Sequence, residues 1–130
     1  MELFLCLFLF FVIRASTLDT ITPGQSIKDG ETLVSADESF ELGFFSPERS
    51  KSRYLGVWYK KVTVRTVVWV ANRGAPISDP LGVLSFSDQG ILALQNSTKI
   101  IVWSSNMSRT AHKPFARLLE SGNFVVKRPK

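Results

Sequence analysis

The hexapeptide VVWVAN, at residues 67–72, returns 34 residues later as IVWSSN, at residues 101–106. Each copy holds β-branched residues around a tryptophan and ends at an asparagine, so Trp69 and Trp103 occupy equivalent positions. Recurrence at a fixed interval is the signature of a duplicated structural unit. The repeat therefore predicts a fold assembled from similar units.

A second strand-like segment precedes each tryptophan segment: YLGVWY at residues 54–59 and ILALQ at residues 91–95. The segment LLESGNFVV, residues 118–126, opens a third unit of the same kind. Its tryptophan would fall near position 137, after the last residue given. The sequence thus predicts three units, the third of them truncated.

Turn-forming pairs such as Pro23-Gly24, Asp29-Gly30 and Ser121-Gly122 recur about every ten residues, with short alternating runs between them. This spacing indicates an all-β sandwich, barrel or prism. The 130 residues are 45% apolar and 12% aromatic, which suits one packed domain.

Residues 3–13 form an unbroken apolar run, followed by small residues at positions 15–17. Eleven apolar residues are too few to span a bilayer but suit the core of a secretory signal peptide. We expect residues 1–18 to be this leader, cleaved near positions 15–18, and residues 19–130 to be a secreted, extracellular domain. Because Cys6, the only cysteine, lies in the leader, the domain must fold without a disulfide.

Charge and residue content exclude several functions. The net charge of +5 is scattered rather than arranged as a basic stripe with exposed aromatics, so we expect no nucleic-acid site. One histidine, His112, and no cysteine outside the leader leave no cluster for a metal. Since no nucleophile elbow or phosphate loop occurs either, we expect no enzyme and no cofactor.

Three β-units with equivalent tryptophans resemble the bulb-type mannose-binding lectin domain. The detailed resemblance is to the amino-terminal part of plant S-domain (S-locus glycoprotein type) receptor-like kinases. That resemblance implies an all-β prism of three pseudo-symmetric antiparallel sheets, incomplete at its C-terminus, and a fragment or short form of a longer receptor. It is carried by DTITPGQSIKDGETLVSADESFELGFFSP (19–47), YLGVWYKK (54–61), TVVWVANRGAPISD (66–79) and LLESGNFVV.

The resemblance also implies a mannose motif, Q-x-D-x-N-x-V-x-Y, whose alternate residues share one face of a strand. The third unit keeps only Asn123 and Val125, and the first, aligned by its last two letters, keeps only Val57 and Tyr59. The second keeps none. The aligned residues are Lys51, Arg53, Leu55, Val57 and Tyr59; Ser87, Gln89, Ile91, Ala93 and Gln95; and Leu119, Ser121, Asn123, Val125 and Lys127.

We therefore expect a recognition domain that binds no free mannose and recognises an extracellular protein or a larger acidic glycan. The alternative is a functional mannose-binding lectin. Asn123 has two interpretations, a sugar ligand or a turn residue whose amide satisfies nearby backbone groups, and the turn is favoured.

Four further expectations follow from the same residues. Trp69 and Trp103 should fill the prism axis, whereas Trp58 could be core or surface. The truncated third unit should leave an open sheet edge, which favours a homodimer by strand exchange. In an exported chain, the N-x-S/T sequences at Asn96 and Asn106 are candidate glycosylation sites.

Overall fold

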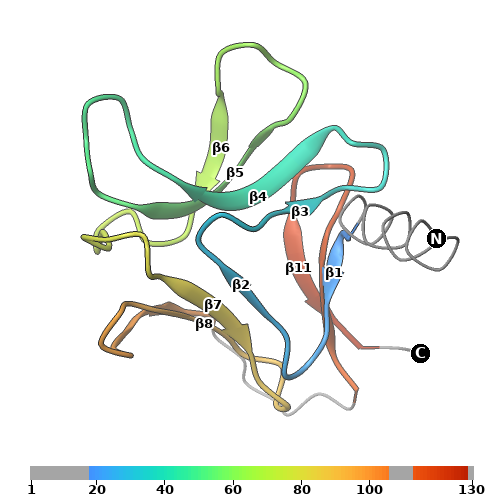
Figure 1. The fold of residues 1–130 in the computed structure, drawn as a ribbon. Coiled ribbons are helices and arrows are strands. Elements are labelled where there is room, and N and C mark those ends of the chain that lie inside the picture. The colour runs from blue at the N-terminus through green and yellow to red at the C-terminus, as the bar shows by residue number, and fades with distance from the viewer. Residues whose placement is uncertain (1–17, 106–112, 129–130) are drawn as a thin grey trace, which may run out of the picture.

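The structure, a computed structural model, describes residues 18–105 and 113–128, and these residues form eleven short β-strands (Figure 1). No helix in the described ranges is long and apolar enough to cross a membrane. The strands are β1 (Thr20–Ile21), β2 (Ser26–Lys28), β3 (Leu33–Val34), β4 (Phe40–Phe45), β5 (Tyr54–Tyr59), β6 (Val67–Val70), β7 (Val83–Phe86), β8 (Leu92–Gln95), β9 (Ile101–Ser104), β10 (Phe115–Leu118) and β11 (Phe124–Lys127).

The strands form three antiparallel sheets that surround a common centre (Figure 1). The first sheet has the order β3-β4-β5-β6, the second β2-β7-β8-β9 and the third β1-β10-β11. The segment up to Val34 contributes one edge strand to each sheet, so that Thr20 pairs with Arg117. This arrangement confirms the predicted all-β fold of three antiparallel sheets, the third of which has three strands among the described residues.

The tryptophan repeat reappears as a repeat of strand register. Val57 of β5 lies opposite Trp69 of β6, and Leu94 of β8 lies opposite Trp103 of β9. In both pairs the register shifts at the next residue, a bulge that re-aims the strand. The two units can therefore be matched residue by residue.

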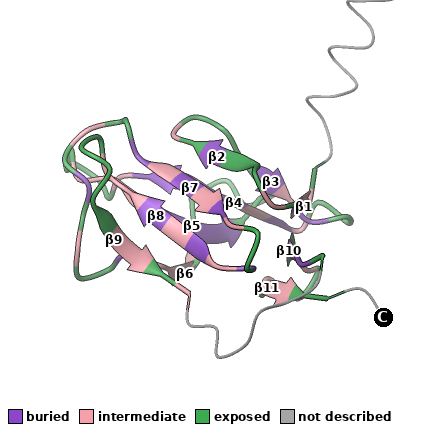
Figure 2. Cartoon of the chain, turned by 90° about the horizontal axis from the view of Figure 1, so that it is seen from below, coloured by how far each residue is buried: buried purple, intermediate pink, exposed green. Residues whose placement is uncertain are grey.

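The core is formed by alternate residues of the central strands, which point inward from all three sheets. Along β7 and β8 buried residues alternate with half-buried ones, as Figure 2 shows. Removing each such aliphatic side chain from water contributes about 1.5–3 kcal/mol. The residues with no exposed surface are Leu42, Leu55, Val57, Leu84, Leu94, Ala116 and Leu118.

The tryptophans differ from one another in burial. Trp69 and Trp103 meet edge to face with ring centres 5.8 Å apart, and they pack on the core while staying half-buried. Trp58 is only 6% exposed. Among the described residues no strand pairs with β11 on the side away from β10.

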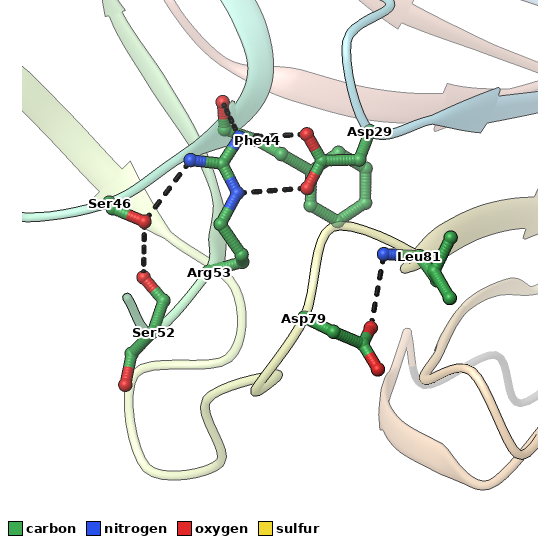
Figure 3. Close-up of polar contacts among 7 residues, drawn as sticks. All are labelled: Asp29, Phe44, Ser46, Ser52, Arg53, Asp79 and Leu81. Atoms are coloured by element: carbon green, nitrogen blue, oxygen red, sulfur yellow. Dashed lines mark hydrogen bonds and ion pairs between the residues drawn. The ribbon is translucent and has the colours of Figure 1, made fainter. Parts of the chain in front are cut away.

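One polar side chain joins two sheets, and another braces the first sheet from within. The Arg53 guanidinium bonds both carboxylate oxygens of Asp29, at 2.7 and 2.9 Å, which joins the first sheet to the end of β2 (Figure 3). This hydrogen bonding raises the pKa of Arg53. The buried Asn72 accepts the Leu55 N–H through Oδ1 at 2.9 Å and donates to the Ala75 carbonyl at 3.0 Å. Both side chains act as internal supports.

Candidate ligand-binding faces

The strand pairing defines three equivalent outward rows, one on each sheet. In β8, Ala93 points outward because it precedes the inward Leu94. In β5, Gly56 is the equivalent outward residue because it precedes the inward Val57. In β11 that place belongs to Val125, beside Val126. We call these outward rows, together with the residues opposite them on adjacent strands, the first, second and third faces. Their residues are Tyr54, Gly56 and Trp58; Ile91, Ala93 and Gln95; and Asn123, Val125 and Lys127.

This register corrects the sequence alignment of the first unit, which is wrong by one residue. Val57 has no exposed surface and points into the core, so it is not available to a sugar. Tyr59, at the end of β5, lies on the same side of the strand as Val57, but it is 41% exposed, and its ring packs against Phe40 with centres 4.9 Å apart. A shift of one residue moves a side chain to the opposite face of a strand. The outward residues are Gly56 and Trp58.

The first face is filled by aromatic side chains. Phe45 lies across Gly56, where an added Cβ would come within 2.7 Å of the Phe45 ring. The Phe45 ring meets Trp58 edge to face at 6.0 Å, and the Arg65 guanidinium covers Trp58 at 4.8 Å. The indole N–H of Trp58 donates to Glu41 at 3.0 Å. No open groove remains at these positions for a sugar ring.

The second face carries small and neutral side chains. Ile91, Ala93 and Gln95 are all half-buried, and Ser85 and Ser104 lie opposite Ala93 on the neighbouring strands. The row holds neither a carboxylate nor an aromatic hydroxyl. It offers few groups for binding a polar ligand.

On the third face Asn123 is exposed at the end of the β10–β11 turn. The turn is closed by the Leu119 N–H on the Asn123 carbonyl at 2.8 Å and by the Gly122 N–H on the Leu119 carbonyl at 3.0 Å. Gly122 has a φ of 90°, and an added Cβ would lie 2.9 Å from Phe40. Within residues 18–105 and 113–128 the Asn123 side-chain amide makes no hydrogen bond, so the backbone and Gly122 form this turn without it.

Arg117 lies directly opposite Val125, in the middle of the third face. Its Nε donates to the Thr20 hydroxyl at 3.1 Å and lies 3.7 Å from the Asp19 carboxylate. Its Cζ lies 5.2 Å from the centre of the Phe115 ring. Folding the predicted hairpin about Ser121-Gly122 would have placed Arg117 beside the row, but reading each strand alone misses it.

A cavity adjoins the third face at Phe115. Its volume is about 430 Å³, and its lining is mainly apolar with one carboxylate and one ammonium group. It lies where the β1–β2 turn, the β7–β8 turn and the start of β10 meet. The lining residues are Thr22, Pro23, Asp88, Lys113, Pro114 and Phe115.

Asn96 lies in an exposed turn after β8, and Asn106, the other candidate glycosylation site, lies outside the described residues. Asn96 Oδ1 accepts the hydroxyl of Thr98 at 2.8 Å and the backbone N–H of Thr98 at 3.0 Å. This turn ties Asn96 to Thr98 through its oxygen and leaves its amide nitrogen without a bond to any described residue.

No group of three or more potential metal-binding side chains occurs among the described residues. Residues 1–17, which include Cys6, and His112 lie outside them. In the described ranges the structure therefore offers no metal site to weigh against the three faces.

Comparison with protein families gives one match, the D-mannose binding lectin family, over residues 66–130. A putative G-type lectin S-receptor-like serine/threonine-protein kinase of Arabidopsis thaliana is 41% identical over 114 residues, which is 88% of this chain and 14% of the relative. Its relative B120, from the same plant, is 45% identical over 133 residues, covering 96% of this chain and 16% of the relative. The chain thus spans about a seventh of the length of these curated relatives.

Solved structures with this fold include lectins of low sequence identity. The mannose-specific agglutinin from snowdrop bulbs, in complex with methyl-α-D-mannoside, superposes with a TM-score of 0.64 at 18% identity, over 86% of this chain and 91% of that one. A garlic (Allium sativum) lectin gives 0.67 at 12% identity, over 86% and 95%. These likenesses concern the fold.

Proposed function

The chain belongs to the D-mannose binding lectin family, and from this premise we propose that it is an extracellular recognition domain that binds its ligand on the third face. The supporting observation is the contrast among the three outward rows. Of the three, the third alone combines an exposed amide, Asn123, with an exposed cation, Lys127. The fold and the family are those of binding proteins, so we assign the chain no catalytic role.

We propose further that the third face does not bind free mannose. A single-sugar groove of about millimolar strength corresponds to roughly 4 kcal/mol. Relative to the family motif, Leu119 lacks an amide, Ser121 lacks a charge and Lys127 lacks a positioned hydroxyl. At about 1 kcal/mol for a neutral hydrogen bond and 1.5–3 for a charged one, these losses approach the whole binding energy.

The second candidate is a functional mannose-binding lectin. One observation favours it: Asn123 and Val125, the two motif residues kept in the third unit, share the outward side of β11 and its turn. An exposed, unengaged amide is the kind of group that binds sugar hydroxyls. This candidate requires Asn123 to supply most of the binding free energy.

Titration calorimetry with mannose and a mannose-rich oligosaccharide decides between the two candidates, with the snowdrop agglutinin as positive control. We expect no measurable heat of binding from this chain. Saturable binding that disappears in Asn123→Ala would establish the mannose lectin instead. Because the Asn123 amide supports no described contact, we expect Asn123→Ala to keep the melting temperature of the wild type.

We also propose that residues 1–18 are a leader, removed near positions 15–18, and that Asn96 and Asn106 carry glycans. Asn96 is half-buried, but the turn that follows it is exposed, and its amide nitrogen makes no hydrogen bond to a described residue. Both features support modification at this site. The names of the relatives are those of receptor kinases, and a surface receptor needs such a leader. Amino-terminal sequencing and glycosidase digestion of the secreted chain are the test. An intact Met1 together with an unshifted gel band would contradict both assignments.

A further inference from the structure

The side chains around Phe115 point to a ligand class. We propose that the third face and the adjoining cavity bind an anionic glycan, whose ring packs on Phe115 while its acidic groups meet Arg117, Lys127 and Lys113. This inference rests on the proposed recognition function and names its ligand class. It does not depend on the motif residues Asn123 and Val125, because the side chains that support it lie mainly on β10 and around the cavity.

Three basic residues neighbour Phe115 through strand pairing, a ring contact or a shared cavity lining. Lys127 lies directly opposite Phe115 in the β10–β11 pairing. Arg117 follows two residues later on the same side of β10, with its guanidinium 5.2 Å from the ring centre. Lys113 lines the cavity together with Phe115. Side chains directly opposite on a sheet lie about 5 Å apart, so one sugar unit can reach the ring and a cation together.

Arg117 is held in place before any ligand binds. The Thr20 hydroxyl accepts a hydrogen bond from its Nε and itself donates to Asp19 at 2.8 Å, while the Arg117 Cζ lies 5.2 Å from the centre of the Phe115 ring. Only Nε is engaged with these partners, so the two terminal nitrogens remain as donors for a carboxylate or a sulfate. A guanidinium fixed in this way loses little conformational entropy when it binds.

Two carboxylates, Asp19 and Asp88, lie at the border of the site and restrict the kind of ligand that fits. Asp19 lies 3.7 Å from Arg117 Nε, on the β1 side of the face, and orients that side chain. Asp88 lies in the cavity lining with Lys113 and can accept sugar hydroxyls. The cations Lys113, Arg117 and Lys127 outnumber these two carboxylates. A ligand with both hydroxyls and anionic groups therefore fits better than a purely anionic one.

The chain's other basic cluster lacks these features and provides a matched control. Lys60 and Lys61 begin the β5–β6 loop, which carries the exposed Val62 and Val64. Lys60 lies 3.8 Å from Glu38, and Arg65 covers the buried Trp58. Changing both lysines alters the net charge without touching the third face.

The experiment is calorimetric titration of the secreted chain with four probes: a uronic-acid tetrasaccharide, its fully methyl-esterified form, a sulfated neutral tetrasaccharide and tetraglutamate. We expect binding of the two anionic glycans, weakened by salt, and none of the neutral ester or the peptide. Binding of only one of the two anionic glycans also supports the proposal and identifies the acidic group.

The variants Arg117→Gln and Lys127→Gln should each weaken binding about tenfold, since each removes a charged hydrogen bond.

The variant Lys60→Gln/Lys61→Gln should bind like the wild type, and its loss of binding would overturn the assignment to this site. Lys127 makes no contact that Lys127→Gln would remove from the described structure, so this variant tests the proposal even if Arg117→Gln folds poorly. Equal binding of the neutral ester overturns the anionic ligand but keeps the recognition function. Equal binding of tetraglutamate would mean that the ligand is an acidic peptide and not a glycan. If none of the four probes binds, this inference is wrong.

Failure of the proposed function, which places ligand binding on the third face, has a separate readout. It would appear as binding, to any of these probes or to mannose, that is unchanged in a triple variant of Arg117, Asn123 and Lys127. Binding would then lie elsewhere on the chain, whatever the charge of the ligand.

Discussion

On the first face Trp58 lies beneath Arg65 and is 6% exposed, whereas Lys127, its equivalent on the third face, is open to solvent. Gly56 leaves room for Phe45 to lie across the sheet, and Val125 at the same place faces Arg117. The backbone register is the same on both faces. The difference shows that inward residues fix the frame while outward residues decide whether a face is closed or available.

The largest effect is expected when two valines, one pointing into the core and one pointing outward, are each replaced by asparagine. Val57→Asn places an amide in the core and leaves a gap, so we expect a loss of about 3 kcal/mol in the free energy of unfolding. Val125→Asn, on the third face, should cost less than about 1 kcal/mol. Urea denaturation of both variants measures the difference. Equal costs would mean that the register assigned to β5 is wrong.

A smaller effect is expected from completing the third sheet. We expect an extension of about 25 residues, taken from a full-length relative, to pair with β11 and cover Trp69 and Trp103. Burying the rest of these rings should add about 2 kcal/mol, enough to raise Tm by several degrees. Calorimetric melting of the two chains is the measurement.

The chain as given presents the β11 edge to solvent among the described residues, and such edges favour association. We therefore expect it to form dimers by strand exchange, detectable by sedimentation, and the extended chain to form fewer. Identical melting temperatures for the two chains would refute the role assigned to the added residues.

The repeat at Trp69 and Trp103 predicted similar β-units, and the turn spacing left a sandwich, barrel or prism open. The arrangement as a prism of three sheets came from the family resemblance. The same reasoning failed on the first face. Matching the letters of Val57 and Tyr59 to a motif ignored which side of β5 is buried, and the bulge after Val57 was not visible in the sequence.

The site itself was only half predictable. Asn123 and Val125 could be found along one strand, but Arg117 joins them only across a hairpin, and Lys113 only through a cavity between sheets. The expected role of the Asn123 amide in its turn was also wrong, since Gly122 and backbone bonds close that turn. Contacts between strands depend on register, which local sequence patterns do not specify.

The most direct test of the central claim is a glycan array probed with three forms of the secreted chain: wild type, the third-face variant Asn123→Ala/Lys127→Gln, and the first-face variant Arg65→Gln. We predict that the wild type and Arg65→Gln give the same signals, on acidic glycans and not on mannose, and that the third-face variant loses them. Signals that survive in the third-face variant, or disappear in Arg65→Gln, would contradict the assignment of recognition to the third face.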